Sequence, residues 1–323
     1  MTRPEMLTSA FRKLSASLGQ NPLRVQGPGG NTSIKDAEVM WIKASGTELA
    51  DAERTSIFVA VDRAAAVAEA REEAGDGSCK SAILDPTLNL RPSIETTFHA
   101  ALDWAVVVHT HSVATITHAI SPEGRRIAKE KLQGLPVVMV PYAKPGLPLT
   151  REILARVQPD TQAVILQNHG LICCGDTVEQ VQALIEDVES RLDLPANVSF
   201  SEKPNETAPE GFGWSEQGWL ATNTRAAELA LTGTYYPDHV VFLGPALPTE
   251  DNETSPAAVL RPGQGVLIRD GATSSQKAML RCLKDVLARL PEDWTVDPIG
   301  AEAEAELLNW DAEKYRQALA ARS

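Results

Sequence analysis

The sequence predicts an α/β protein, because segments with the patterns of strands and of helices alternate along roughly its first 195 residues. The 323 residues can form one large domain or two smaller ones, and either is long enough to bury a hydrophobic core. Apolar residues make up 43% of the sequence and charged residues 23%, which is typical of a globular protein.

The first part of the chain supplies most of these elements. Apolar and β-branched runs predict strands, whereas alanine-rich segments and apolar residues at helical spacing predict helices. We expect strands at 38–45, 105–110 and 135–143 and helices at 62–74, 93–104 and 112–120. Ser93 is the expected cap of the helix at 93–104.

Two further segments complete this first part. Residues 161–176 should form two strands, or one bent pair, around the sequence NHG at 168–170. A helix with an apolar stripe follows at 176–192, and Asp176 or Thr177 should be its cap.

The rest of the chain is predicted to be an extension of the main domain. We place the main domain at 1–195, a polar linker or mobile loop at 196–213, and a C-terminal α/β extension at 214–323. We expect a helix at about 215–231, strands at 239–244 and 266–270, and helices at about 274–289 and 301–321. The extension should pack on the main domain, although a separate domain would show the same pattern.

Charge and cysteine content narrow the functions to consider. The 30 basic and 43 acidic residues give a net charge of −13, which argues against a nucleic-acid surface. No apolar run approaches the roughly 20 residues that cross a bilayer, and we expect neither a membrane partner nor a secretory signal. The four cysteines show no disulfide framework, which favours a cytoplasmic location.

Histidines end two of the predicted strands. His109 and His111 follow an apolar run, and their side chains should share one face because residues two apart in a strand do so. His169 ends a second apolar run. Three histidines are a common ligand set of catalytic zinc, although histidines at strand ends can also be structural. The other histidines lack this setting, and we expect them to be structural: His99, His118 and His239.

Two glycine turns and one carboxylate lie between these histidines and the N-terminus. GPGGNTSIK (27–35) could cradle a phosphate with backbone N–H groups and hydroxyls, or it could be a tight turn into a strand. ASGTEL (44–49) repeats this pattern after a predicted strand. Glu95 falls in the first turn of a predicted helix, where a carboxylate is ordinarily a partner of the helix N-terminus.

Five motifs together resemble a known family. GPGGNTSIK, KASGTEL, PSIETTFHA, VVHTHS and QNHGLI occur in the order and spacing of the class II (zinc-dependent) aldolases of the aldolase/adducin family, over roughly residues 5–195. PSIET, YPDHVVFLGP and LLNWDAEKYRQAL also look similar to the aldolase half of bifunctional rhamnulose-1-phosphate aldolase/alcohol dehydrogenases. The resemblance implies a three-layer α/β/α sandwich around a mainly antiparallel sheet, and a homotetramer.

The resemblance also implies roles for individual residues. It makes His109, His111 and His169 the ligands of Zn²⁺ or another divalent metal. It makes Glu95 the catalytic acid and base. The substrate phosphate would be bound by residues of the two glycine turns and of PSIET: Gly30, Asn31, Ser45, Gly46 and Ser93.

Two details of the family pattern are altered or unassigned. Phosphate-binding members often have two consecutive serines before the acidic residue, whereas this chain has Ser93-Ile94. The missing hydroxyl weakens the expected phosphate site and leaves room for a different or non-phosphorylated substrate. The family also uses a tyrosine as proton donor, for which Tyr142 is a candidate by position. Three more tyrosines lie in the tail, at Tyr235, Tyr236 and Tyr315.

The resemblance therefore implies a zinc-dependent aldehyde-lyase with a sugar or sugar-phosphate substrate. It would split a ketose phosphate similar to rhamnulose 1-phosphate by a retro-aldol reaction, through an enediolate whose charge the metal stabilises. Epimerisation at C4, dehydration and decarboxylation of a sugar acid use the same kind of site and remain alternatives. A non-catalytic binding module similar to adducin is a further alternative.

Overall fold

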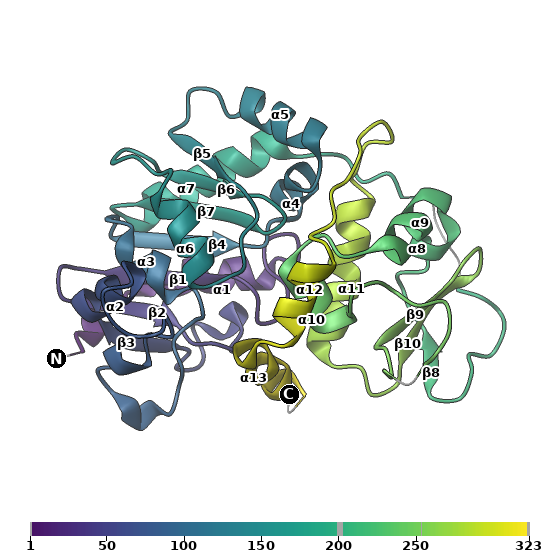
Figure 1. Cartoon of the computed structure of the whole chain (residues 1–323), viewed down its shortest axis with the longest axis horizontal. Helices are drawn as coiled ribbons and strands as arrows, with labels where there is room; N and C mark the ends of the chain where they lie inside the picture. The colour runs from purple at the N-terminus through teal and green to yellow at the C-terminus, as the bar shows by residue number, and fades with distance from the viewer. Residues whose placement is uncertain (1, 199–202, 253, 322–323) are drawn as a thin grey trace.

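A mixed sheet forms the centre of the main body in the computed structural model, which describes residues 2–198, 203–252 and 254–321 (Figure 1). Its strands are β1 (Asn31–Lys35), β2 (Val39–Lys43), β3 (Phe58–Asp62), β4 (Val106–Thr110), β5 (Val137–Val140), β6 (Ala163–Leu166) and β7 (Gly170–Gly175). Among the described residues they form one seven-stranded sheet in the order β3-β2-β1-β4-β7-β6-β5. Neighbouring strands are antiparallel, except that β5 and β6 are parallel.

Helices fill most of the connections between these strands. They are α1 (Ser9–Gln20), α2 (Arg63–Ala70), α3 (Thr96–Ala101), α4 (Val113–Ala119), α5 (Pro122–Lys131), α6 (Leu147–Leu154) and α7 (Val178–Leu192), with short 3-10 helices at Pro4–Met6, Leu49–Asp51, Lys80–Ala82 and Pro86–Leu88. The cap of α7 is Thr177, one of the two residues predicted for this position. Its side chain accepts a hydrogen bond from the Gln180 N–H. The predicted cap of α3 was wrong, because Glu95 rather than Ser93 occupies that position.

The helices cover both faces of the sheet, which confirms the predicted three-layer α/β/α sandwich. Val106 and Val108 of β4 belong to a hydrophobic core with α1 and α7, whereas Val107 belongs to the opposite core with α3 and α6. This alternation follows from the two-residue repeat of a strand. The same alternation directs His109 toward the α3 face and Thr110 toward the other face.

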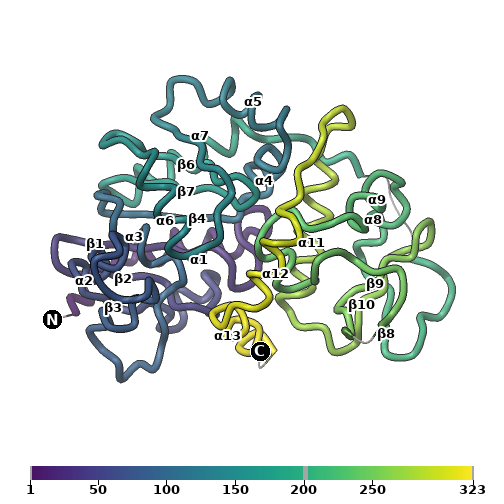
Figure 2. Tube along the Cα trace, in the orientation of Figure 1, coloured from purple at the N-terminus to yellow at the C-terminus, as the bar shows by residue number. Residues whose placement is uncertain are grey.

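The C-terminal part forms a second, smaller α/β unit beside the main body (Figures 1 and 2). Its strands β8 (Phe212–Trp214), β9 (Ala258–Arg261) and β10 (Gly265–Arg269) form an antiparallel sheet in the order β8-β10-β9. Its helices are α8 (Trp219–Thr222), α9 (Thr224–Thr232), α10 (Pro237–Leu243), α11 (Ser274–Leu287), α12 (Ala301–Leu308) and α13 (Asp311–Ala320). Val113 and Ile116 of α4 belong to its hydrophobic core, so this core continues into the main body.

The predicted strand at 239–244 was wrong, because these residues lie mostly in helix α10. Pro237 occupies the first turn of this helix, where its missing N–H has no cost, and every residue of the helix is buried. A short helix that is buried on all sides has no polar face and therefore no helical repeat in its sequence. Periodicity alone could not distinguish it from a buried strand.

Two predicted long helices are each divided in the structure. The helix expected at about 215–231 becomes α8 and α9, and Asn223 between them caps α9 by accepting from the Ala226 N–H. The helix expected at 301–321 becomes α12 and α13. The break between α12 and α13 lets α13 turn back toward the main body (Figure 1).

Part of the predicted linker at 196–213 lies outside the described residues, at 199–202. Strand β8 begins at Phe212, within the predicted range. Within the described part of the chain, no helix is both long enough and apolar enough to cross a membrane.

Candidate active site

Three imidazoles meet at one end of the central sheet. His109 is the fourth residue of β4, His111 follows that strand directly, and His169 lies in the turn between β6 and β7. Pairing of β4 with β7 sets this turn beside the end of β4. One nitrogen atom from each ring lies within 4.8 Å of the corresponding nitrogens of the other two rings. The ring centroids are 4.9 to 5.3 Å apart.

Two features of the turn after β6 position His169. The side-chain amide of Asn168 donates to the Tyr235 carbonyl at 3.1 Å and to the Asp297 carbonyl at 2.7 Å, which ties this turn to the C-terminal part. Gly170 lies against β4 so closely that a Cβ would be 2.3 Å from the Thr110 carbonyl oxygen. Because only glycine permits this approach, the sequence NHG brings His169 next to β4.

Hydrogen bonds leave two of the ring nitrogens available for a ligand. The Nδ1–H of His109 donates to the Leu171 carbonyl at 3.0 Å, so Nε2 of this ring carries the lone pair, and it is buried without a hydrogen-bond partner. Nδ1 of His169 is also buried without a partner. Burial lowers the pKa of His109 and lowers the pKa of His169 to about 3, which keeps both rings neutral near pH 7.

The Glu95 carboxylate faces this cluster. Its Oε2 is 3.6 Å from His109 Nε2, and its Oε1 is 3.6 Å from His169 Nε2. The Asn31 side-chain amide donates to Oε2 at 2.8 Å, whereas Oε1 has no hydrogen bond. Burial by itself raises the pKa of Glu95, but the two imidazoles and the Asn31 amide outweigh it and lower that pKa to about 2.

These groups fit a divalent metal ion. Buried polar atoms ordinarily have hydrogen-bond partners, and here Nε2 of His109, Nδ1 of His169 and Oε1 of Glu95 have none. Three imidazoles with an adjacent carboxylate are a donor set that suits zinc and similar metals. His109, His111 and His169 would hold the ion, and Glu95 would lie beside it.

His99 supports the cluster from behind rather than belonging to it. Its Nδ1 is 2.7 Å from Ser33 Oγ, and its Nε2 contacts the side-chain oxygen of Asn31. The side-chain amide of Asn31 also donates to Ser93 Oγ at 3.1 Å. His99 therefore orients the same amide that holds Glu95. The other two histidines expected to be structural lie elsewhere: Nδ1 of His118 bonds the Ala114 carbonyl, and His239 lies against Tyr235 and Tyr236.

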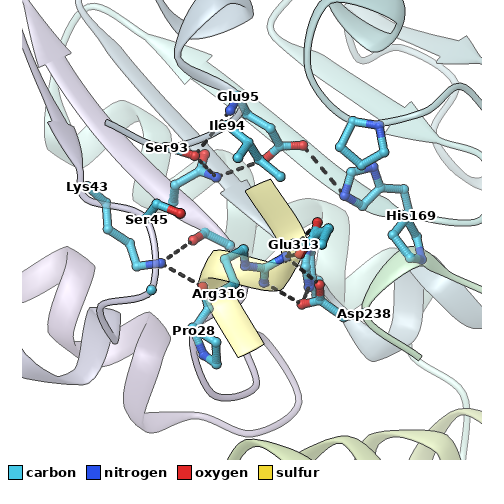
Figure 3. Close-up of a pocket in the computed structure, with 16 residues that line it drawn as sticks. Pro28, Lys43, Ser45, Ser93, Ile94, Glu95, His169, Asp238, Glu313 and Arg316 are labelled. Carbon is cyan, nitrogen blue, oxygen red and sulfur yellow. Dashed lines mark hydrogen bonds and ion pairs between the residues drawn. The ribbon is translucent and has the colours of Figure 1, made fainter. Parts of the chain in front are cut away.

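The residues predicted to bind phosphate line one pocket together with the metal cluster (Figure 3). They are Gly30, Asn31, Ser45, Gly46 and Ser93, and Glu95, His111 and His169 line the same pocket. The sequence analysis missed Lys43, whose ammonium group donates to the carbonyls of Pro28 at 2.7 Å and Gly30 at 3.0 Å. Burial lowers the pKa of Lys43 to about 7, and its hydrogen bonds fix the glycine-rich loop.

Three more pocket residues come from the C-terminal part and were also missed. Asp238 of α10 places Oδ2 3.2 Å from His111 Nδ1. Arg316 of α13 donates to the two oxygens of Asp238 at 2.9 and 3.2 Å and to the carboxylate of Glu313 at 2.8 and 3.0 Å. Figure 3 shows these side chains gathered in the pocket. The available sequence signal was the resemblance of the segments YPDHVVFLGP and LLNWDAEKYRQAL, which contain these three residues but gave none of them a role.

The contact between His111 and Asp238 is enclosed by the glycine-rich loop. A Cβ on Gly29 would lie 2.7 Å from His111 Nδ1 and 2.9 Å from Asp238 Oδ2, so only glycine fits there. Burial raises the pKa of Asp238, but the Arg316 guanidinium outweighs it and holds that pKa well below its usual range. Asp238 is therefore an anion that faces one of the three clustered histidines.

The four tyrosines do not meet the cluster. Among the described residues that line the pocket, none is a tyrosine. The hydroxyl of Tyr142 is buried without a hydrogen bond, and that of Tyr235 donates to the Leu229 carbonyl at 2.8 Å. The ring of Tyr315 lies beneath the Arg91 guanidinium, 3.9 Å away. A tyrosine proton donor therefore stays unassigned.

Comparison with known proteins decides the family. The sequence model described as "Class II Aldolase and Adducin N-terminal domain" matches residues 11–194, more than half of the chain. The chain belongs to this family. As a member of the class II aldolase/adducin family it combines the expected mainly antiparallel three-layer fold with a cluster of three histidines.

Individual relatives of this class II aldolase/adducin chain carry different names. It is 34% identical over 166 residues to "Uncharacterized oxidoreductase YuxG" of Bacillus subtilis (strain 168), a match that covers 47% of this chain and 24% of that protein. It is 29% identical over 119 residues to "3-oxo-tetronate 4-phosphate decarboxylase" of Escherichia coli (strain K12), covering 32% of this chain and 55% of that protein. The chain thus spans about a quarter and about half of these relatives.

One solved structure shows a similar domain. The N-terminal class II aldolase domain of a conserved protein from Thermoplasma acidophilum is 28% identical, with a TM-score of 0.49, over 56% of this chain and 89% of that one.

Proposed function

We propose that the protein is a zinc-dependent aldehyde-lyase that splits a ketose phosphate similar to rhamnulose 1-phosphate. The observation that carries the proposal is the Glu95 carboxylate, held by Asn31 and 3.6 Å from nitrogens of two of the three clustered histidines. An ionised carboxylate beside a metal-binding cluster can take and return a proton at the substrate.

The histidines and Glu95 have different roles in the proposed reaction. A divalent ion held by His109, His111 and His169 would supply Lewis-acid stabilisation of negative charge on the substrate oxygens. As the C3–C4 bond breaks, the C4 hydroxyl gives its proton to the Glu95 carboxylate, the aldehyde forms, and the bonding electrons remain on C3 of an enediolate. Glu95 then returns this proton to C3, and the hydrogen bond from Asn31 aims its carboxylate.

The phosphate end of the substrate is assigned to the glycine turns as part of this proposal. Gly30, Asn31, Ser45, Gly46 and Ser93 line the same pocket as Glu95, which supports the assignment. Ile94 also lines this pocket and offers no hydrogen bond from its side chain. Phosphate binding would therefore depend more on backbone N–H groups than on hydroxyls.

Decarboxylation of a sugar acid is the second candidate function. A relative that is 29% identical over 119 residues has the name of a 3-oxo-tetronate 4-phosphate decarboxylase. Decarboxylation also leaves an enediolate that needs a proton, so the same residues would serve it. The two reactions differ in whether the substrate gives up an aldehyde or carbon dioxide.

A substrate screen of the zinc-loaded protein separates these functions. Rhamnulose 1-phosphate, free rhamnulose and 3-oxo-tetronate 4-phosphate are incubated in parallel, and lactaldehyde and carbon dioxide are measured. Lactaldehyde from the phosphorylated ketose is the expected result. Carbon dioxide without lactaldehyde would replace the lyase with the decarboxylase, and no turnover of any substrate by metal-loaded protein would favour a binding module.

The predicted homotetramer and cytoplasmic location belong to the same proposal. The four cysteines are free and buried, which fits a reducing compartment. Light scattering tests the tetramer, because the proposal expects the mass of four 34.8 kDa chains.

A further inference from the structure

The metal pocket has too little free space for a sugar. The pocket that contains Glu95, His111 and His169 has a free volume of about 30 Å³. Pockets that bind small molecules span about 300–1,000 Å³, and a space of this size holds a few water molecules at most. A sugar can enter only if an element that lines the pocket moves; this step rests on the proposed function, which supplies the sugar.

Side chains of helix α13 fill the part of the pocket that a substrate would need. Glu313 and Arg316, three residues apart and therefore on one face of the helix, both line the pocket. The exposed fractions of these side chains are 1% and 8%. Figure 3 shows them in the pocket, beside Asp238. The charged groups of α13 therefore lie where a substrate would lie.

A larger cavity lies on another side of the same helix. Its volume is about 640 Å³, within the range of small-molecule sites. Ser45 and Ile94 line both this cavity and the metal pocket, and Ala312 and Tyr315 of α13 line the cavity. Charged side chains of both signs also line it, the basic Lys80, Arg91 and Lys144 and the acidic Asp76, Glu306 and Asp311. Helix α13 thus forms a partition between the metal pocket and a cavity large enough for a sugar phosphate.

Few apolar contacts hold α13 in place. Among the described residues of this helix the buried ones are Glu313, Arg316 and Ala320. Leu319 packs on Gly46, and the Gln317 amide donates to the Val241 carbonyl. Buried ion pairs contribute little net stability because desolvation offsets their attraction. The Tyr315 ring also lies against the Arg91 guanidinium, 3.9 Å away. Polar contacts thus hold α13 more than a buried apolar face does, which lowers the free energy needed to undock it.

We propose that α13 is a gate between the metal pocket and the larger cavity. When α13 is docked, Glu313 and Arg316 fill the substrate space. When it undocks, the two spaces join and admit a sugar phosphate, whose reacting carbons lie by Glu95 and whose anionic end faces the basic residues of the cavity. Undocking also withdraws the Glu313 carboxylate, which would repel a phosphate inside the pocket.

Backbone hydrogen exchange on the full-length protein tests this gate. Amides of α13 should exchange faster than those of β4, because they open locally rather than by global unfolding. Gln317→Ala and Leu319→Ala, which remove contacts away from the histidine cluster, should each speed exchange in α13 about tenfold and leave β4 unchanged. Inorganic phosphate should speed it further in the wild-type chain, because it binds the open state.

Lys314→Gln is the matched control, since Lys314 is an exposed residue of the same helix and should leave exchange unchanged. Exchange in α13 that is as slow as in β4, and unaffected by Gln317→Ala, Leu319→Ala and phosphate, would overturn the gate. The measurement needs no turnover. If no substrate is turned over in the screen, but exchange of the α13 amides responds as expected to the two variants and to phosphate, the proposed function is rejected and the gate is retained.

Discussion

The two sides of the candidate site are held by different kinds of contact. The histidines are carried by β4 and the β6–β7 turn, where backbone pairing across the middle of the sheet fixes their positions. The facing side is carried by α10 and α13, and hydrogen bonds from Arg316 to Asp238 and Glu313 hold it together. Metal binding can therefore be rigid while the space for substrate remains adjustable.

The largest effect is expected from the rigid side. His169→Ala removes one of three proposed ligands, and the loss of metal should lower kcat/KM by about 1,000-fold or more, because the ion stabilises charge worth several kcal/mol. Bound metal is measured by atomic absorption in the same samples. His118→Ala is the control variant, and it should keep the wild-type metal content because His118 lies outside the cluster. A His169→Ala protein with full metal content would contradict the assignment.

Glu95→Gln should separate chemistry from metal binding. The amide keeps the size of the side chain but cannot exchange a proton, so kcat should fall by about 100- to 10,000-fold while metal content stays near that of the wild type. Steady-state kinetics and metal analysis are compared side by side. Wild-type turnover in this variant would remove the acid–base role of Glu95.

Asp238→Asn probes the link between the two sides. A carboxylate that bonds a metal-binding histidine orients its ring, and its loss typically weakens metal affinity by about 10- to 100-fold. Competition with a chromogenic chelator measures this affinity. Asp297→Asn is the control, because that carboxylate lies near the surface and is not part of the pocket. Equal affinities in the two variants would show that Asp238 does not support His111.

The smallest effect is a pH dependence on the adjustable side. Burial raises the pKa of Glu313 from 4.5 to about 6, against the opposing attraction of Arg316 and with the help of Asp238 and Glu95. Its docked pKa is above its undocked value, so docking is strongest below pH 4.5 and weakens as the pH rises through about 6.

Exchange of α13 amides, corrected for the intrinsic pH dependence, should therefore rise up to about tenfold between pH 4.5 and 6.5. Glu313→Gln should remove this rise, and any slope that persists in the variant belongs to other groups of the pocket. A slope of zero in the wild type after this correction would show that Glu313 does not control docking.

The same contrast explains how much the sequence could predict. His109, His111 and His169 were predictable because each follows an apolar run that is local in the sequence, and the motif resemblance supplied the role of Glu95. Asp238 was not, because it precedes an apolar run whose helical form depends on burial from all sides. Glu313 and Arg316 have the spacing of an ordinary exposed ion pair on a helix, and nothing local indicates that their helix folds back into the pocket.

The hydrogen bonds of Asn168 have a consequence for engineering. Because its amide donates to carbonyls at Tyr235 and Asp297, the turn that presents His169 is completed by backbone from far along the chain. A transplant that ends near residue 195 would carry all three histidines and the whole central sheet, yet leave this amide facing water. A graft of the catalytic unit into another scaffold should therefore extend at least through Asp297.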